Sequence, residues 1–452
     1  MTTLVVVGGS DAGVSAALAA REVDPRAQIA MVLADAYPNF SVCGLPFFLS
    51  GEVADWRALA HRTREEILAH RIDLRPDTRA DEIDPARRVL WVRDPTRGRV
   101  PLPYDRLVVA TGAEPVRPPV AGLDLPGVFQ LHTMEEGRTI HAWLTAAAPG
   151  RALVVGAGYI GLELADALTR RGVAVTVVEA APAPLPTVDR ALGERVGALL
   201  RAHGVGLVTG VKVSGIAATT SGLLVRGEGG WEGTADMVLV VVGVRPRTDL
   251  ARTAGIAPGP SGALAVGRTM ATSVPDVWAA GDCVETYHRL LRRSTYLPLG
   301  TTAHKQGRVA GINAMGGAAQ FAGSLGTQVV KVFDSVVART GLRDEEALTA
   351  GWDPVTVETT AWDHKAYYPG ARELTLRLTG DRRSGRLLGA QLLGPPSSAK
   401  RIDILATALY HGMAVEELSD LDLGYTPPVA SPWDPVQAAA QAWIREGRPA
   451  RA

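Results

Sequence analysis

Cysteine is almost absent from this chain of 452 residues, which contains only Cys43 and Cys283. Two cysteines cannot build a disulfide scaffold, and they are too few for a cysteine-rich zinc or iron–sulfur site. We therefore expect no metal centre, and we expect a protein of a reducing compartment, the cytoplasm.

Net charge and long apolar runs are missing as well. Lys+Arg and Asp+Glu both number 47, so no electrostatic argument favours nucleic acid or an anionic membrane as a partner. Apolar runs such as residues 237–242 are far shorter than the roughly 20 residues that span a bilayer. The opening MTTLVVVGG starts a strand without a basic segment or a cleavage site, so we expect no secretory leader.

Glycine-rich turns between apolar runs are what the chain does contain. The first pattern is strand, turn, helix and strand: Leu4–Val7, Gly8 to Gly13, Val14–Glu22 and Ile29–Leu33. Asp35 follows, 22 residues after Gly13, where an acid can accept from a ribose hydroxyl. This order predicts a dinucleotide-binding βαβ unit.

The same order recurs 148 residues later with a complete GxGxxG fingerprint. Its parts are a strand, three glycines, a helix, a second strand and a terminal acid: Ala152–Val155, Gly156, Gly158, Gly161, Leu162–Arg171, Val173–Val178 and Glu179. The glycines allow a tight turn, a close approach to a pyrophosphate and close packing of helix on strand. A 2′-phosphate would meet the Glu179 carboxylate with no cation nearby, which favours NADH over NADPH.

The sequence pattern changes near residue 321, and no glycine fingerprint follows. Alternating runs predict an antiparallel sheet with strands at 329–333, 374–378 and 387–393, and a helix at 401–411. We therefore predict an α/β protein with two Rossmann-like three-layer domains and a C-terminal α+β domain, to which the family resemblance described below assigns dimerisation. The expected boundaries are 1–118 with 245–320 for the first domain, 119–244 for the second and 321–452 for the third.

Cys43 is the strongest candidate for redox chemistry. It lies thirty residues after Gly13 and begins Cys-Gly-Leu-Pro, a helix start where the dipole favours a thiolate. No second cysteine is near, which leaves a mixed disulfide with a small thiol or a sulfenic acid as its oxidised form. Cys283 is interpreted as a packing residue.

Several stretches together resemble one family. GGSDAGVSAALAA, YDRLVVATGAEPVRPP, VVGAGYIGLELADAL and VWAAGDC are similar to the flavoprotein pyridine nucleotide–disulfide oxidoreductases. The stretch FSVCGLPFF resembles the single-cysteine branch, which holds coenzyme A disulfide reductases, NADH oxidases and NADH peroxidases. YYPGA, KRID and GYTPP, after residue 366, resemble the interface domain of the coenzyme A disulfide reductases.

The resemblance implies a role for each matching residue. It assigns FAD to the first domain and to seven residues: Gly8, Gly13, Asp35, Thr111, Gly112, Asp282 and Thr302, the last at a helix start aimed at the flavin. It assigns NADH to Gly156, Gly158, Gly161, Glu163 and Glu179. It also implies a homodimer, in which Tyr367 and Tyr425 of one chain reach Cys43 of the other.

The expected function is electron transfer from NADH through FAD to Cys43 and on to the disulfide of a small thiol, with coenzyme A as one candidate. Two alternatives stay open: an NADH oxidase that uses oxygen, and a reductase of a ferredoxin- or rubredoxin-type protein in which Cys43 is not used. Asp11 stands where the oxidases and peroxidases carry histidine, which counts against peroxide chemistry. Val42, Ala19 and Glu22 replace the asparagine and arginines usual in the coenzyme A enzymes, which counts against coenzyme A.

Overall fold

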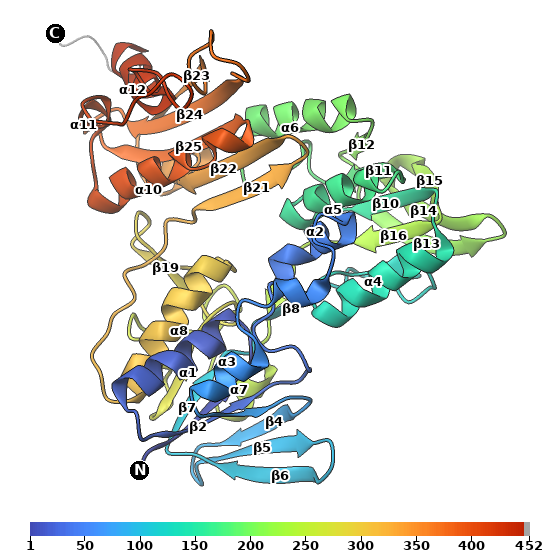
Figure 1. The fold of residues 1–452 in the computed structure, drawn as a ribbon, viewed down its shortest axis with the longest axis vertical. Helices are drawn as coiled ribbons and strands as arrows, with labels where there is room; N and C mark the ends of the chain where they lie inside the picture. Colours follow the sequence, from blue (N-terminus) through green and yellow to red (C-terminus); the bar gives the residue numbers. More distant parts are fainter. Residues whose placement is uncertain (447–452) are drawn as a thin grey trace.

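The first sheet of the computed structural model, which describes residues 1–446, is built from two distant segments of the chain. Its parallel strands have the order β18-β7-β1-β2-β3. They span Val277–Ala279, Arg106–Val109, Thr3–Val7, Gln28–Val32 and Ile72–Arg75. Figure 1 shows this unit at the N-terminal end of the molecule. Strand β18 joins the earlier strands through β7, so residues near 280 come to lie beside the first glycine turn.

Two helices packed unusually close to each other cover one face of this sheet. They are α1 (Asp11–Val23) and α8 (Gly300–Ala314). A Cβ at Gly307 would lie 2.1 Å from the carbonyl oxygen of Ala12, and one at Gly311 would lie 2.1 Å from that of Ala16. These two glycines therefore let the helix backbones touch. The other face packs against the antiparallel strands β4 (Arg79–Asp84), β5 (Val89–Asp94) and β6 (Gly98–Pro103).

The second sheet has the same parallel design and the order β12-β11-β10-β16-β9. Its strands span Gly206–Thr209, Ala174–Glu179, Arg151–Val155, Met237–Val240 and Val128–Phe129. Helices and a small antiparallel sheet flank it: α4 (Met134–Ala147), α5 (Tyr159–Arg170), α6 (Arg190–Ala202), β13 (Val213–Thr219), β14 (Gly222–Gly227) and β15 (Glu232–Ala235). The chain crosses between the two units on a ribbon of β8 (Ala113–Pro115) and β17 (Val244–Pro246).

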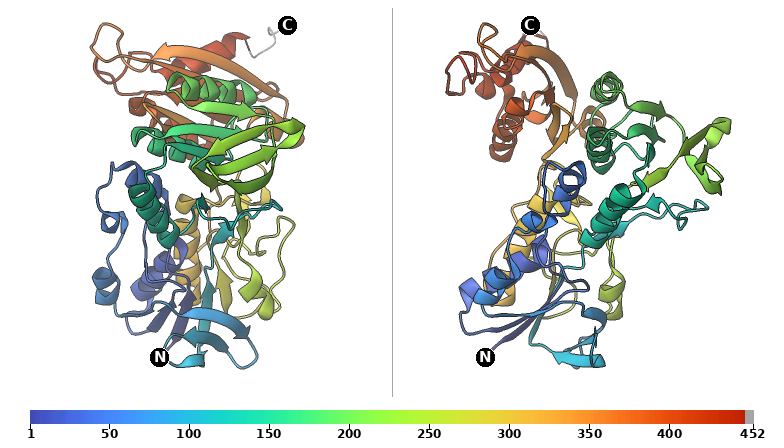
Figure 2. Two further views of the ribbon diagram at one scale, coloured as in Figure 1. Left: turned by 90° about the vertical axis from the view of Figure 1, so that its right-hand side faces the viewer. Right: turned by 45° about the vertical axis from the view of Figure 1, so that its right-hand side comes forward.

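The C-terminal part is one antiparallel sheet with helices on one side, and Figure 2 shows it in two further views. The strand order β21-β22-β25-β24-β23 covers Gln328–Val332, Ser335–Gly341, Leu387–Gly394, Glu373–Asp381 and Pro354–Trp362. Helices α10 (Arg401–His411), α11 (Val415–Ser419) and α12 (Pro435–Glu446) complete its core. The predicted fold class is confirmed. The predicted domain boundaries stay a prediction, and residues 447–452 of the third domain lie outside the described residues.

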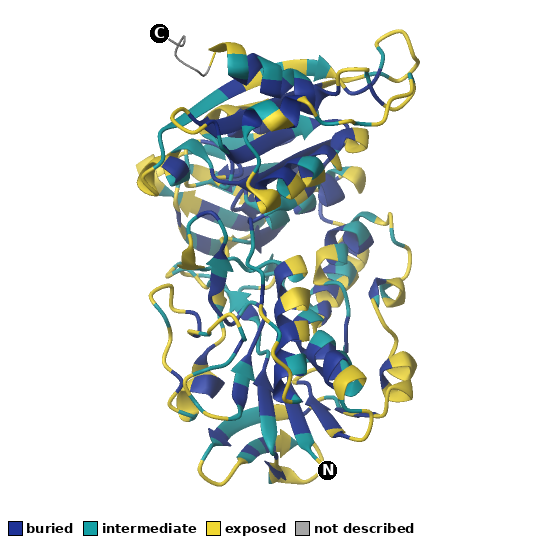
Figure 3. Ribbon diagram, turned by 90° about the vertical axis from the view of Figure 1, so that its left-hand side faces the viewer, coloured by how far each residue is buried: buried dark blue, intermediate teal, exposed yellow. Residues whose placement is uncertain are grey.

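Short elements complete the described chain. They are α2 (Leu45–Ser50), α3 (Arg64–Ala69), α7 (Asp249–Thr253), α9 (Asp344–Thr349), β19 (Thr286–His288), β20 (Arg293–Thr295) and the 3-10 turns η1 (Val42–Gly44), η2 (Trp56–Leu59), η3 (Glu228–Gly230) and η4 (Pro396–Ser398). Burial follows the sheets, which are dark in Figure 3 while loop tips and outer helix faces are exposed. Among residues 1–446, every helix is too short or too polar to cross a membrane.

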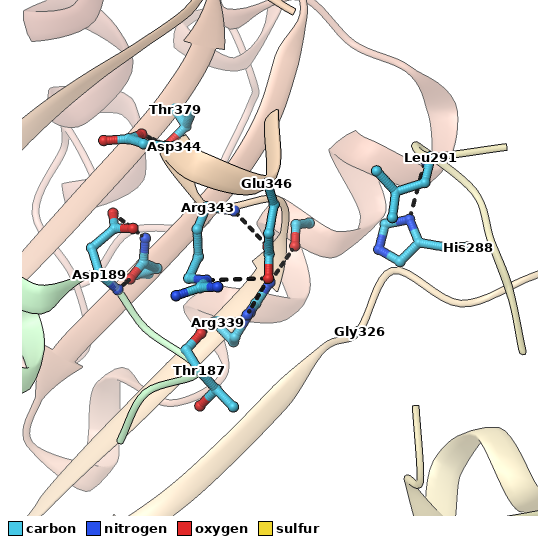
Figure 4. A network of polar contacts seen from close by, with 12 residues as sticks. Thr187, Asp189, His288, Leu291, Gly326, Arg339, Arg343, Asp344, Glu346 and Thr379 are labelled. Carbon is cyan, nitrogen blue, oxygen red and sulfur yellow. Dashed lines mark hydrogen bonds and ion pairs between the residues drawn. The ribbon is translucent and has the colours of Figure 1, made fainter. Parts of the chain in front are cut away.

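A buried polar network joins the second unit to the C-terminal sheet (Figure 4). Arg339 is 9% exposed; its guanidinium donates to Glu346 Oε2 at 2.7 Å and to the Thr187 carbonyl oxygen at 2.5 Å. Asp189 and Gln391 exchange two hydrogen bonds of 2.6 Å across the same junction. Because these bonds leave few buried donors unpaired, the junction has a defined geometry.

The core of the C-terminal domain offers a direct stability test at Trp443. This side chain is fully buried on α12, its indole N–H donates to the Val355 carbonyl at 2.9 Å, and its ring lies over Gly380. Trp443→Ala leaves a cavity and an unpaired carbonyl, so we expect a loss of about 3–5 kcal/mol of unfolding free energy. Urea unfolding followed by circular dichroism measures it. Arg445→Ala, at an exposed position of the same helix, is the control and should change stability by less than about 0.5 kcal/mol.

Candidate active site

The first glycine turn connects β1 to α1 and is too tight for a side chain. Gly8 has φ of 116°, and a Cβ there would lie 2.1 Å from the Ala110 carbonyl oxygen. A Cβ at Gly13 would lie 1.9 Å from the Gly8 carbonyl oxygen. Helix α1 therefore starts directly against the strand ends, with its first N–H groups at the turn, as a pyrophosphate site requires.

Polar atoms around this turn have the character of a ligand cradle. Asn39 is buried, its N–H donates to the Gly9 carbonyl at 2.7 Å, and its Nδ2 has no partner among the described residues. The Tyr296 hydroxyl, close enough to Asp282 to feel its charge, is also buried without a partner. Buried donors of this kind are rare unless a ligand or water satisfies them. These residues therefore fit FAD.

The other predicted FAD residues differ in how many of their hydrogen-bonding groups are already used within the chain. Asp35 is exposed at the end of β2, with one carboxylate oxygen accepting from the Tyr37 N–H at 2.9 Å. Thr111 donates its hydroxyl to the Arg247 carbonyl at 2.7 Å, and Gly112 beside it has φ of 69°. Thr302 is buried and uses both donors inside the chain, on Ser324 Oγ and the Leu299 carbonyl. Helix α8 begins at Gly300, so its free N–H groups precede Thr302.

The second glycine turn repeats this geometry between β10 and α5. Gly156 has φ of 104°, and a Cβ at Gly161 would lie 1.9 Å from the Gly156 carbonyl oxygen. Gly158 differs, because no atom of residues 1–446 other than its chain neighbours lies within 4 Å of a Cβ placed there. The carboxylate of Glu179 accepts from the Ala157 N–H at 2.6 Å and the Ala181 N–H at 2.7 Å. These bonds hold the acid against the turn, where it fits the ribose of NADH.

Cys43 lies in the 3-10 turn η1, just before α2. The residue is exposed, while chain atoms around its sulfur, followed by the charges of Glu163, Asp11 and Asp282, raise the pKa of its thiol. The expectation that a helix start would favour the thiolate is wrong for these surroundings, because burial of the sulfur and three carboxylates oppose the thiolate and α2 has only six residues. Cys283 is fully buried, and its thiol faces the Ala280 and Val109 carbonyl oxygens, as expected of a packing residue.

Glu163 is the residue of the second unit whose charge acts on the Cys43 thiol. It is half-buried on α5, which packs against α2, and it lines a small recess with Pro46, Phe47 and Lys331. Burial raises the pKa of Glu163 to about 7; Lys331 lowers it and Asp166 raises it further. A carboxyl that titrates near neutrality beside a thiol can hold or deliver a proton.

His304 on α8 is a residue that the sequence analysis missed. Its Nε2 lies 3.3 Å from Asp11 Oδ1, and its Nδ1 lies 2.9 Å from Ser15 Oγ. The hydrogen bond to Asp11 raises the pKa of His304. Asp11 and Ser15 lie on one face of α1, but only the α1–α8 packing brings an imidazole to them. The site thus has an imidazole beside position 11, although residue 11 itself is acidic.

Tyr367 and Tyr425 lie in loops of the C-terminal domain, after β23 and after α11. Tyr367 follows β23 at one edge of the C-terminal sheet, whereas α2 packs with the β21 edge at the other side. The two tyrosines interact with each other and are 74% and 46% exposed. Both are surrounded in sequence by further exposed large side chains: Trp362, Tyr368, Val429 and Trp433. Packing of both tyrosines in the core of their own domain is therefore excluded.

The structure has two glycine turns of the dinucleotide-binding type. It also has one exposed cysteine, whose pKa is raised by charges from both units. Together these features define a dinucleotide-dependent redox enzyme. Residues 2–307 match the family described as pyridine nucleotide-disulphide oxidoreductase, and residues 327–435 match its dimerisation domain. The chain belongs to this family. The predicted identity as an FAD-dependent NAD(P)H oxidoreductase is thereby confirmed.

Proteins with different named activities match nearly the whole chain. The chain is 32% identical to an NADH oxidase of Methanocaldococcus jannaschii over 97% of both chains. It is 33% identical to an NAD(P)H sulfur oxidoreductase (CoA-dependent) of Pyrococcus furiosus, over 97% of this chain and 98% of the relative. The solved structure of an NAD-dependent persulfide reductase from A. fulgidus matches with a TM-score of 0.94 and 37% identity, over 98% of this chain and 84% of that one.

The two NADH-turn glycines give a matched test. Gly161→Ala forces a clash with the Gly156 carbonyl, so it should lower the melting temperature and abolish reduction of the flavin by NADH. Gly158→Ala has open space within the protein, so it should keep the melting temperature and weaken NADH by about tenfold or more, since the methyl takes the place of the pyrophosphate. Thermal melts and stopped-flow flavin reduction measure both. Equal melting temperatures and equal NADH affinities for the two variants would contradict this geometry.

The raised pKa of Cys43 predicts how its alkylation depends on pH. The thiolate alone reacts, so the iodoacetamide rate should rise with pH and level off above the ordinary thiol range. Glu163 is ionised above about pH 7, and Glu163→Gln removes that charge, so the rate profile should move to lower pH. Glu52→Gln removes a charge from the same recess, but Glu52 is not one of the three carboxylates that raise the pKa of Cys43, so this variant should leave the profile in place. An unchanged profile in Glu163→Gln would show that the two groups are not coupled.

Proposed function

We propose that this enzyme uses NADH to reduce the disulfide of a small thiol through Cys43. The observation that carries the proposal is the position of Cys43: exposed, without a second cysteine in reach, and influenced by Asp11 and Asp282 of the first unit and Glu163 of the second. We assign FAD binding to residues 1–118 and 245–320, NADH binding to 119–244 and dimer formation to 321–452. We place the reaction in the cytoplasm, because two free thiols suit a reducing compartment.

The proposed chemistry is thiol–disulfide exchange. The Cys43 thiolate attacks one sulfur of a disulfide RSSR, the RS–SR bond breaks, and one RS⁻ leaves while a Cys43–S–SR bond forms. Two electrons from NADH then break this mixed disulfide, releasing the second RS⁻ and restoring the Cys43 thiolate. The sum is RSSR + NADH + H⁺ → 2 RSH + NAD⁺. FAD, when bound, supplies the two-electron relay between the nicotinamide and the sulfur.

We assign proton transfer to side chains of the protein itself. Glu163 has a pKa of about 7, so near neutrality it can take the proton of the Cys43 thiol and return it to a leaving thiolate. The hydrogen bond to Asp11 raises the pKa of His304, which favours the positively charged imidazolium beside that carboxylate. That charge reduces the negative field of Asp11 on Cys43, which favours the reactive thiolate.

Coenzyme A is our candidate thiol, although α1 lacks the expected arginines. Arg21 is fully used by the fold, because its guanidinium donates to backbone carbonyls that include those of His70, Ala27 and Arg71. Glu22 is neutralised by Arg308 of α8 at 2.8 Å. This ion pair removes the negative charge that would oppose an anionic ligand on α1, and the Pyrococcus furiosus relative, whose name includes the words CoA-dependent, supports the choice.

A second function, oxygen reduction, is favoured by one observation. The NADH oxidase branch carries a histidine inside the first glycine turn, and here His304 brings an imidazole to Asp11 at that position. The Methanocaldococcus jannaschii relative is named an NADH oxidase. In that reaction Cys43 would cycle through a sulfenic acid. Steady oxygen consumption with NADH and no disulfide present would identify it.

Replacing the thiol separates these functions. Cys43→Ser should keep the bound flavin and its reduction by NADH, while disulfide turnover falls by about two orders of magnitude or more, because no other exposed thiol exists. Cys283→Ala is the control and should keep full turnover. Coenzyme A disulfide reduction, oxygen uptake and stopped-flow flavin reduction are measured on both. Full disulfide turnover in Cys43→Ser would overturn the proposal and favour direct transfer to a protein or small acceptor.

The exposed tyrosines predict that the active site is shared between two subunits. We propose a symmetric homodimer in which Tyr367 and Tyr425 donate hydrogen bonds near the partner's Cys43. The double variant Tyr367→Phe with Tyr425→Phe should keep the dimer mass in analytical ultracentrifugation and lower disulfide kcat by about tenfold. Tyr410→Phe, also exposed but on α10, is the control. A monomer in solution, or an unchanged kcat in the double variant, would contradict the shared site.

A further inference from the structure

A cavity of about 240 Å³ lies away from the two glycine turns, between the first unit and the C-terminal domain. Its wall is dominated by arginine: Arg268, Arg289, Arg292 and Arg386, with Tyr287, Leu290 and Ala322. Tyr287 belongs to β19, Arg289 and Arg292 to the turn after it, and Arg386 to the turn before β25. Four cations from two domains therefore face one small space.

These arginines lack counter-ions. Across residues 1–446, most ion pairs involve arginine, yet none of these four guanidinium groups lies within 4.0 Å of a carboxylate oxygen. His288, next to Tyr287, has a pKa lowered to about 4 by burial, so it is neutral at pH 7 and does not add to the positive charge. Four like charges around one cavity repel one another, and an anion between them would relieve that repulsion.

Two of the arginines are held in place by the backbone. Arg268 Nε donates to the Phe321 carbonyl at 2.9 Å. Arg289 donates to the Ala322 carbonyl at 2.8 Å and to the Tyr410 carbonyl at 2.9 Å, and its guanidinium lies 3.7 Å from the centre of the Tyr410 ring. Neutral carbonyls and an aromatic face fix the side chains without cancelling their charge. The remaining N–H groups are thus oriented before any ligand arrives.

Arg386 adds an unsatisfied donor. Its Nε is buried and has no hydrogen-bond partner within the described part of the chain, while its guanidinium lies 5.7 Å from the centre of the Trp352 ring. A buried charged donor without an acceptor is costly, so its persistence calls for a ligand or water. Phosphate oxygens are the acceptors that match a guanidinium fork best.

We propose that this arginine cavity binds a multiply charged phosphate anion and, by holding both domains, fixes the first unit against the C-terminal sheet. A carboxylate of single charge would leave most of the four guanidinium groups unneutralised, whereas a phosphoryl or pyrophosphoryl group offers several acceptors and two or more charges. The site differs from both dinucleotide turns and stands independently of the proposed reaction.

The test uses the FAD-bound enzyme, with inorganic pyrophosphate and inorganic phosphate as probes in isothermal titration calorimetry. One saturable site per chain is expected, together with a rise in melting temperature that grows with probe concentration. Arg292→Gln, whose side chain makes no hydrogen bond among those described, should weaken pyrophosphate by about tenfold, and Arg268→Gln combined with it by about a hundredfold. Arg293→Gln, exposed and one residue outside the wall, should change affinity by less than about twofold.

A second arm distinguishes free phosphate from a nucleotide phosphate. ADP is titrated with NAD⁺ present at saturation, so that the second dinucleotide turn is filled. Tighter binding of ADP than of pyrophosphate that is lost in Arg292→Gln assigns the site to a nucleotide, and equal binding assigns it to the phosphate alone. No saturable binding of either probe, or the same weakening by Arg293→Gln as by Arg292→Gln, would overturn the proposal.

Discussion

The contact between a glycine and a carbonyl oxygen at each βα turn is the constraint on which the rest of the molecule depends. Gly13 rests on the Gly8 carbonyl and Gly161 on the Gly156 carbonyl, with no room for a methyl group in either place. This contact seats α1 and α5 with their N-termini at the strand ends, where both dinucleotide sites must be. It also fixes Asp11, in the first turn of α1, and Glu163, the fifth residue of α5. Cys43 is therefore influenced by both units because each is built on the same tight turn.

The negative charge around Cys43 disfavours its thiolate, whereas a helix start alone would favour it. Burial of the sulfur and the charges of three carboxylates raise the pKa of the thiol, and two of these carboxylates have raised pKa values themselves, about 7 for Glu163 and about 6 for Asp282. Acids that are partly protonated near neutrality oppose the thiolate less than full charges would. His304 compensates Asp11 from α8. The site thus keeps the thiol protonated until a nearby base or cation shifts the balance.

Much of the fold and part of the site could be predicted from local sequence patterns, because the predicted features depend on residues that are close in sequence. The glycine turns, Glu179, the antiparallel C-terminal strands and the lone cysteine all follow from spacing within a few dozen residues. His304, the backbone role of Arg21 and the four unpaired arginines could not be predicted, since they depend on helix packing and on domains that meet late in the chain. The thiolate expectation failed for the same reason: the dipole argument uses neighbours in sequence, whereas the opposing carboxylates come from three separate elements.

In the proposed reaction, Cys43 carries a small thiol as a mixed disulfide between the two half-reactions. Mass spectrometry of the protein purified without reductant tests it most directly. We expect an added mass on the peptide that contains Cys43, equal to one small thiol and removed by NADH under anaerobic conditions. An unmodified Cys43 that stays unmodified after incubation with a disulfide substrate, in enzyme that still turns that substrate over, would contradict it.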